Sequence, residues 1–334
     1  MEAATLQYRP YNTLLPPAKD TMHRIVFLDR DSLHADVRAP GFPHAWQDHD
    51  ATSADQVVAR LQGATVAITN KVPLRADAIA RLPDLQFVAI AATGTDNVDL
   101  DACRARGIQV ANIRNYSLVS VPEHAFTLLL ALRRNLRAYQ DDVAAGRWET
   151  SERFCLLDHP IGDLAGSRIG IVGYGALGRQ VAQLARAFGM QVAATARAPI
   201  GDADVIQLEL DELLRTCDVV SLHLPLNDAT RHMIGARELA LMPPGALLLN
   251  TARGGLVDEA ALAAALRDGR IGAGFDVLSQ EPPRAGNPLL GLRLPNFILT
   301  PHIAWASRGA MQTLADMLVD NIEAWQAGQP RNLV

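Results

Sequence analysis

The chain has 334 residues, of which 49% are hydrophobic and 20% charged, a composition typical of globular proteins and unlike that of disordered or collagen-like chains. Its length favours two domains, each with a proper core. Lys and Arg number 31 and Asp and Glu 36, giving a net charge of −5, so the composition shows no sign of the basic patch typical of nucleic-acid binding.

The three cysteines, Cys103, Cys155 and Cys217, are scattered along the chain and show neither metal-ligand spacing nor a disulfide pattern. We therefore expect reduced thiols, no bound metal and a cytoplasmic protein. No apolar run reaches the ~18 residues of a membrane-spanning helix, and the N-terminus lacks the pattern of a secretory signal. The sequence thus predicts no membrane association.

The first part of the chain predicts alternating strands and helices. Residues 1–22 contain several prolines without periodicity and are predicted to be an N-terminal extension, or to precede a natural start at Met22. Short apolar runs then predict strands at 25–29, 66–69, 87–90 and 108–111, with amphipathic helices between them, such as 54–62 and 74–81. This alternation indicates parallel βαβ units.

A second series of elements follows an apolar-rich helix predicted over 122–138. Strands are predicted at 168–172, 191–195, 218–222, 246–250, 271–275 and 297–300, and a final helix at about 308–326. Helices are predicted between most of these strands, which indicates a second doubly wound parallel sheet.

A glycine-rich loop lies between the strand at 168–172 and a helix that follows it. The loop reads Gly173-Tyr174-Gly175-Ala176-Leu177-Gly178, and its position between strand and helix is the context that makes such a motif informative. The first glycine makes the tight turn, the second lets the backbone approach a pyrophosphate, and the third allows close helix packing. We therefore predict that these six residues bind a dinucleotide.

The next strand predicts which dinucleotide is preferred. An NAD site is expected to place Asp or Glu at the end of this strand to bind the ribose 2′-hydroxyl, whereas this chain has Ala196-Arg197. A guanidinium can bind a 2′-phosphate through paired hydrogen bonds. We predict that NADP is preferred and NAD is possible; in the alternative interpretation Arg197 is a solvated surface residue and both cofactors are accepted.

Three later strand ends carry residue types that can bind an anion and transfer a proton. Arg253 can grip a carboxylate with its planar fork and polarise the adjacent carbonyl. His302 can donate a proton to the carbonyl oxygen, and Glu281, 21 residues earlier, would hold the imidazole and favour its charged form. Because ligands bind outside the carboxyl ends of such strands, we expect the three side chains to share a pocket with a nicotinamide.

At this point the sequence resembles the D-isomer-specific 2-hydroxyacid dehydrogenase family, and within it the glycerate dehydrogenase and hydroxypyruvate (glyoxylate) reductase group. The resemblance covers nearly all of 23–334 and rests on the glycine loop, the three strand-end segments and the runs 26–31, 68–73 and 92–99. It implies the same three catalytic roles for Arg253, Glu281 and His302, and reduction of a small 2-keto acid to the D-2-hydroxy acid.

The resemblance also implies further site residues. Asp276 matches the family residue that binds the nicotinamide carboxamide, and the peptide groups of Thr93-Gly94 match the loop that holds the substrate carboxylate. The remaining implied cofactor contacts are Leu224, Pro225, Thr251, Ala252 and His302. The side chain of His223, at one of these strand ends, is interpreted as structural.

The family architecture implies two Rossmann-like domains separated by a cleft. The substrate domain would comprise 23–118 and 304–334, and the dinucleotide-binding domain 119–303. Family members are usually dimers through the cofactor domain, so a homodimer is expected, with the segment from Arg147 to Leu157 in its arm.

Rival functions within and outside this chemistry stay open to different degrees. A formate dehydrogenase would carry Gln in place of the Glu that pairs with His, so Glu281 argues against it. A phosphite dehydrogenase, or another 2-hydroxyacid dehydrogenase, keeps the same three residues. A non-catalytic dinucleotide-sensing corepressor on the same fold would lack turnover.

Overall fold

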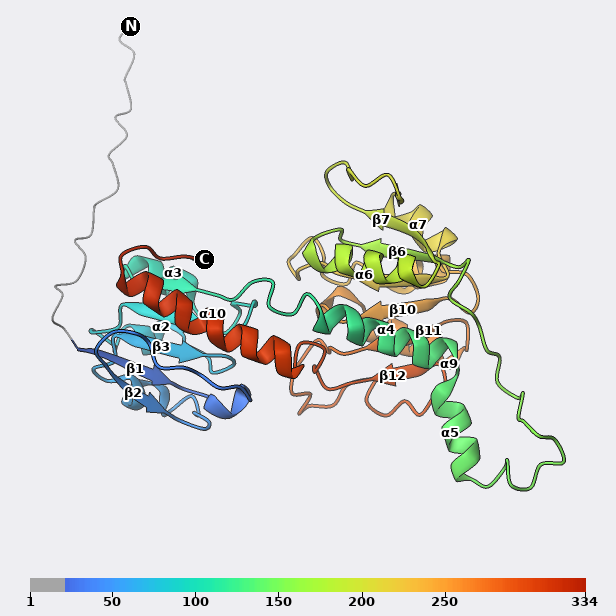
Figure 1. The fold of residues 1–334 in the computed structure, drawn as a ribbon, viewed down its shortest axis with the longest axis horizontal. Coiled ribbons are helices and arrows are strands. Elements are labelled where there is room, and N and C mark those ends of the chain that lie inside the picture. The colour runs from blue at the N-terminus through green and yellow to red at the C-terminus, as the bar shows by residue number, and fades with distance from the viewer. Residues whose placement is uncertain (1–21) are drawn as a thin grey trace, which may run out of the picture. The chain divides into compact units, whose positions relative to one another are not determined.

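The computed structural model describes residues 22–334, so the predicted extension, up to residue 21, lies outside the described residues. The chain divides into two compact units. The first unit is made of two segments, the chain up to Tyr116 and Met311–Val334, and the second unit is Ser117–Ala310. Each unit contains one parallel sheet with helices (Figure 1), which confirms the predicted class of two doubly wound α/β domains.

The first unit contains a five-stranded parallel sheet in the order β2-β1-β3-β4-β5. Its strands are β1 (His23–Phe27), β2 (His44–Asp48), β3 (Val66–Thr69), β4 (Phe87–Ile90) and β5 (Gln109–Ala111). Its helices are the 3₁₀ turn η1 (Arg30–Ser32), α1 (Val57–Leu61), α2 (Ala76–Ile79), α3 (Leu100–Ala105) and most of α10 (Arg308–Gln326). The strand order reverses between β1 and β3, which is where doubly wound sheets bind ligands.

The second unit contains a seven-stranded parallel sheet in the order β12-β11-β10-β9-β6-β7-β8. Its strands are β6 (Arg168–Val172), β7 (Gln191–Thr195), β8 (Val205–Gln207), β9 (Val219–Leu222), β10 (Leu247–Asn250), β11 (Gly272–Phe275) and β12 (Phe297–Leu299). This is the strand order of dinucleotide-binding sheets with one further strand at the edge, and it reverses between β6 and β9.

The helices of the second unit cover both faces of its sheet. They are α4 (Ser120–Arg133), α5 (Leu136–Ala144), α6 (Ala176–Ala187), α7 (Leu210–Thr216), α8 (Ala236–Leu241), the 3₁₀ turn η2 (Gly254–Leu256) and α9 (Glu259–Arg267). Strands β9, β10 and β11 are buried along their whole length, as expected for parallel strands covered on both faces. The apolar side chains therefore sit in two layers, one on each side of the sheet.

The prediction of a single helix over 122–138 is wrong. The structure has two helices, because α4 ends at Arg133 and Asn135 adopts a left-handed backbone with φ of 47° before α5 begins. Asparagine tolerates this conformation better than most residues, and its side chain donates to the carbonyl of Pro160 at 2.5 Å. Figure 1 shows α5 and the loop after it extending away from the body of the second unit.

Two short strands went unpredicted, β2 and β8. Both lie at sheet edges, where half-exposed polar sequence gives a weak apolar pattern. Among residues 22–334, none of the helices combines the length and the apolar character that crossing a bilayer requires.

Candidate active site

The predicted catalytic residues of the second unit follow strands that lie side by side. In the sheet register Asn250 pairs with Phe275, and Phe275 pairs with Leu299. Arg253 and His302 each come three residues after one of these aligned positions. Because parallel strands end at a common edge, both residues emerge at the carboxyl edge of the sheet, where such folds bind ligands.

The structure brings Glu281 and His302 together. His302 Nδ1 lies 2.5 Å from Glu281 Oε2, and the other carboxylate oxygen accepts the N–H of Leu278 at 2.8 Å. The two side chains are 30% and 33% exposed, so the pair can be reached by a ligand. With Nδ1 engaged, Nε2 is the ring nitrogen left to donate or accept a proton.

A hydrogen-bonded frame holds the loop that carries His302. The buried carboxylate of Asp276 accepts Thr300 Oγ1 at 2.5 Å, the N–H of Ile303 at 3.0 Å and the N–H of Ala304 at 2.8 Å. The backbone carbonyl of Asp276 also accepts the His302 N–H at 2.8 Å. This frame holds His302 in a left-handed conformation with φ of 57°, which is uncommon for a residue with a side chain.

The supporting role of Asp276 is one that sequence reasoning missed, as is that of His124 on α4. His124 Nε2 lies 2.9 Å from Thr300 Oγ1 and 3.5 Å from Asp276 Oδ1. Since Thr300 donates its proton to Asp276, it accepts from His124, so Nε2 carries a hydrogen. These partners are 176 residues apart, and no sequence spacing could have joined them.

Arg253 leaves β10 on a rigid turn. The buried Asn250 side chain accepts the Ala252 N–H at 3.0 Å and donates to the Arg253 carbonyl at 2.9 Å. A Cβ on Gly254 would lie 1.9 Å from the Leu278 carbonyl carbon, so only glycine fits behind Arg253. The Arg253 guanidinium is half-buried, donates from Nη1 to the Ala252 carbonyl at 2.7 Å and pairs with no carboxylate of residues 22–334. It is therefore available to an anionic ligand.

The glycine loop has the geometry that a pyrophosphate requires. Gly173 has φ of 101°, and a Cβ there would lie 2.6 Å from the His223 carbonyl oxygen. A Cβ on Gly178 would lie 2.3 Å from the Gly173 carbonyl oxygen, whereas a Cβ on Gly175 would meet nothing within 4 Å. Gly175 caps α6 without a side-chain hydrogen bond, so the helix N–H groups are open to a phosphate.

The other predicted cofactor contacts lie at the same edge. Leu224 and Pro225 follow β9, the neighbour of β6, and Thr251 and Ala252 follow β10. The buried Thr251 Oγ1 has no hydrogen-bond partner within residues 22–334. An unsatisfied buried hydroxyl is costly unless a ligand pairs with it. The residues present therefore fit a bound dinucleotide.

His223 lies at the end of β9 with its Nε2 2.8 Å from Ser221 Oγ. Burial lowers the pKa of His223 to about 4, so the ring is neutral at pH 7. A neutral, hydrogen-bonded ring agrees with the structural interpretation of this side chain, while its backbone borders the glycine loop.

After β7, Arg197 is exposed and makes no hydrogen bond or ion pair with the part of the chain that the structure describes. Tyr174, in the glycine loop, donates its hydroxyl to Asp202 Oδ2 at 2.9 Å. The two residues join the glycine loop to the loop that carries Arg197.

In the first unit, hydrogen bonds to neighbouring residues hold the loop that is predicted to bind the substrate carboxylate. Thr93 Oγ1 donates to the Ile113 carbonyl at 2.7 Å, and Asn112 Nδ2 donates to the Thr93 carbonyl at 2.7 Å. The Thr93 hydroxyl is thus engaged in the fold, and Gly94 is half-buried. This loop follows β4, which pairs with β3, one of the two strands between which the order of the first sheet reverses.

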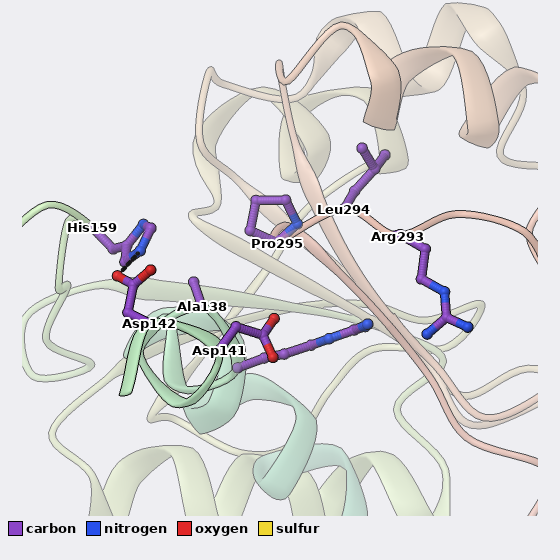
Figure 2. A pocket seen from close by; sticks show the side chains of 8 residues that line it. Ala138, Asp141, Asp142, His159, Arg293, Leu294 and Pro295 are labelled. Atoms are coloured by element: carbon purple, nitrogen blue, oxygen red, sulfur yellow. Dashed lines mark hydrogen bonds and ion pairs between the residues drawn. The ribbon is translucent and has the colours of Figure 1, made fainter. Parts of the chain in front are cut away.

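A cavity of about 420 Å³ lies elsewhere in the second unit, at the base of α5 (Figure 2). It is lined by Arg137, Ala138, Asp141, Asp142, His159, Arg293, Leu294 and Pro295. The predicted catalytic residues are not among them. Within residues 22–334, no group of three or more His, Cys, Asp or Glu side chains is placed to hold a metal ion.

Known proteins are similar to this chain in sequence over most of its length. Residues 126–304 match the family model described as "D-isomer specific 2-hydroxyacid dehydrogenase, NAD binding domain". Glycerate dehydrogenase of Methylorubrum extorquens is 53% identical over 313 residues, which cover 93% of this chain and 98% of that protein. Hydroxypyruvate reductase of Blautia hydrogenotrophica is 37% identical, with 85% and 88% covered.

Solved structures match over similar lengths. An acyclic imino acid reductase in complex with NADPH and D-Arg superposes with a TM-score of 0.79 at 28% identity, covering 93% of this chain and 100% of that one. The fold and site define an oxidoreductase that binds a nicotinamide dinucleotide. The chain belongs to the D-isomer specific 2-hydroxyacid dehydrogenases, which confirms the resemblance found in the sequence.

Proposed function

We propose that the protein reduces hydroxypyruvate or glyoxylate to D-glycerate or glycolate in a reversible reaction. The observation that carries the proposal is the Glu281–His302 contact at the same sheet edge as an Arg253 that has no carboxylate partner in the described chain. The 53% identity to a glycerate dehydrogenase supports the choice of substrate.

In this proposal His302 and Arg253 are the two side chains that contact the substrate. His302 donates a proton from Nε2 to the carbonyl oxygen, while Glu281 orients the ring through Nδ1 and stabilises its charged form. Arg253 binds the carboxylate and polarises the carbonyl. A bound reduced nicotinamide supplies the hydride. The N–H groups of Thr93 and Gly94 are proposed to bind the substrate carboxylate as well.

We propose that the second unit is the dinucleotide-binding domain and the first the substrate domain. The strand order of the second unit, the open glycine loop and the uncapped α6 support this assignment. The cofactor contacts proposed there are the six residues of the glycine loop, Leu224, Pro225, Thr251, Ala252, Asp276 and His302. The Asp276 carboxylate would bind the nicotinamide carboxamide and would also keep its hydrogen bonds to the loop that carries His302.

A panel of steady-state measurements with hydroxypyruvate, glyoxylate, pyruvate and 2-ketogluconate tests the substrate class. We expect the highest kcat/KM for hydroxypyruvate or glyoxylate and a D-configured glycerate product. Phosphite and a keto acid with ammonia serve as comparison substrates, because a phosphite dehydrogenase or an imino acid reductase would prefer those. Absence of turnover with every compound would favour a dinucleotide-sensing corepressor and contradict the proposal.

The proposed cofactor preference is for NADPH. The end of β7 offers no carboxylate to repel a 2′-phosphate, and the exposed Arg197 has no partner in the described chain. A charge-assisted hydrogen bond contributes about 1.5–3 kcal/mol, so we expect NADPH to be favoured about ten- to a hundredfold in kcat/KM. Ala196→Asp combined with Arg197→Ala should reverse the order. An unmodified protein that uses NADH equally well or better would contradict this preference.

We propose a homodimer formed through the arm that comprises α5 and residues 145–163. Phe154, Leu157 and Trp148 in this arm are 91%, 73% and 53% exposed, and apolar side chains gathered at the surface mark interaction sites. Light scattering should give twice the chain mass of 36.0 kDa. Phe154→Asp with Leu157→Asp should give the single-chain mass; a single-chain mass in the unmodified protein would contradict the dimer.

We also propose a cytoplasmic location. All three cysteines are free thiols, which suits a reducing compartment. Cell fractionation with detection of the native protein tests this placement.

A further inference from the structure

The loop between β7 and β8 is held by the side chain of one glutamine, Gln207. Its Nε2 donates to the carbonyls of Ala196 and Ala198, at 3.1 and 3.2 Å, and its Oε1 accepts the N–H of Ile200 at 2.9 Å. Two of these contacts fall on the residues directly before and after Arg197. The glutamine thereby holds the backbone on both sides of Arg197.

A second contact fastens the far end of the same loop. Asp202 Oδ2 accepts the Tyr174 hydroxyl at 2.9 Å and Arg186 Nη1 at 3.0 Å. Hydrogen bonds from Tyr174 and Arg186 hold the pKa of Asp202 below its usual value, so the carboxylate is charged at neutral pH. The loop is thus tied at one end to the glycine loop and at the other to β8.

We infer that Gln207 is a positioning residue for discrimination at the adenosine 2′ position. The inference rests on the proposed function, because it concerns the cofactor preference of that site. Arg197 has no protein partner in the described chain that would hold its side chain, so its placement depends on the backbone on either side. Gln207 is itself exposed and fills no core. Its replacement therefore removes the hydrogen bonds to the loop without changing the packing of the core.

The physical effect is preorganisation. A loop that is ordered before the ligand arrives does not lose that freedom on binding, and ordering one side chain or loop residue changes affinity by about two- to tenfold. The adenine, the ribose and the pyrophosphate are common to both dinucleotides. The 2′-phosphate is the group that differs. A less ordered Arg197 should therefore weaken the binding of NADPH more than the binding of NADH.

Gln207→Met tests the inference, because methionine keeps the length and removes all three hydrogen bonds. Gln191→Met is the matched control: Gln191 begins the neighbouring strand β7, is exposed, and contacts Arg168 rather than the loop. We expect Gln207→Met to raise KM for NADPH about two- to tenfold, with KM for NADH and kcat at saturation changed less than about twofold. The control should leave all of these values unchanged.

A third variant asks whether the effect passes through the guanidinium. In an Arg197→Ala background, Gln207→Met should cause no further rise in KM for NADPH, because contacts that act through one residue are not additive. Binding of 2′,5′-ADP and of 5′-AMP, measured by calorimetry, gives the same comparison without catalysis. The ratio of the two affinities should fall in Gln207→Met and stay constant in Gln191→Met.

The outcomes separate this inference from the proposed preference. If the unmodified protein prefers NADH, the NADPH preference fails, while a fall in the 2′,5′-ADP to 5′-AMP affinity ratio in Gln207→Met still supports a positioning role. An unchanged ratio overturns the inference whichever dinucleotide is preferred. An equal loss of affinity for both probes together with a lower Tm also overturns it, since the only role of Gln207 would then be to stabilise the fold.

Discussion

At the scale of single residues, the proposed chemistry depends on a His302 whose ring and backbone are each held by a hydrogen bond. Glu281 engages Nδ1, and the Trp305 indole N–H donates to the His302 carbonyl at 3.1 Å. The backbone and the ring are therefore held separately. Substitutions of the ring, its carboxylate partner and the nearby arginine should consequently give different kinetic signatures.

His302→Ala removes the proposed proton donor. We expect kcat to fall by about 10²–10⁴, the usual range for general acid–base catalysis, while dinucleotide binding persists. Steady-state kinetics and cofactor titration by fluorescence measure the two effects. His34→Ala, at an exposed histidine, is the control, and a His302→Ala variant with near-normal kcat would exclude the proposed role.

Arg253→Ala should affect both KM and kcat, because the guanidinium would bind the carboxylate in the ground state and the transition state alike. Arg253→Lys keeps the charge and loses the planar fork, so it should recover binding only in part. The same substrate series measures both variants. A change confined to kcat would argue against carboxylate binding by this residue.

Glu281→Gln should lower kcat for keto-acid reduction with little effect on KM. A neutral amide forms a weaker hydrogen bond to the ring than a carboxylate does, so the imidazole that donates the proton would be held less firmly. Steady-state rates with the same substrates test this, and an unchanged kcat would count against a functional Glu281–His302 pair.

At the scale of elements, the β6–loop–α6 segment separates what glycine does for the fold from what it does for a ligand. A side chain at Gly178 would collide with the Gly173 carbonyl, whereas one at Gly175 would enter open space. The two positions look equivalent in the motif but differ in their surroundings.

Gly175→Val should therefore fold normally and bind the dinucleotide poorly, because the side chain would occupy the space where a pyrophosphate approaches. We expect Tm close to that of the unmodified protein and a rise of at least about tenfold in the cofactor Kd, the effect of losing about 1.4 kcal/mol. Gly178→Val is the contrast and should lower Tm or prevent folding. Normal cofactor affinity in Gly175→Val would place the pyrophosphate elsewhere.

At the scale of the whole molecule, an ion-pair network within the first unit joins the C-terminal helix α10 to a segment near the start of the chain. Glu323 receives Arg38 Nη1 at 2.7 Å and the Gly41 N–H at 2.7 Å. Hydrogen bonding to Arg38 lowers the pKa of Glu323 from its usual 4.5 to about 2. A carboxyl group whose pKa is lower in the folded state stabilises the protein above its unfolded-state pKa.

Glu323→Gln should therefore lower the urea midpoint at pH 7, and the difference from the unmodified protein should shrink as the pH falls from about 4.5 to about 2. Glu209→Gln, at an exposed carboxylate without an ion pair in the described chain, is the control. The effect should be modest, because the pair is partly exposed and screened by solvent. A difference that stays constant with pH would exclude this linkage.

The sequence by itself determined the fold class, the family and the residue types of the site. Alternating apolar runs and helices, the glycine loop between a strand and a helix, and strand ends bearing Arg253 and His302 are local patterns that can be found without coordinates. It predicted the contact of Glu281 with His302 across 21 residues, and the structure places these atoms 2.5 Å apart. Their catalytic roles stay predictions.

Only the tertiary structure decided which residues support the site. The links from His124 through Thr300 to Asp276, and from Gln207 to the residues around Arg197, join segments by side-chain hydrogen bonds. Such bonds leave no period or motif in the sequence. The break at Asn135 was decided in the same way, because the Pro160 carbonyl that accepts its side chain comes from 25 residues away, outside the reach of local helix propensity.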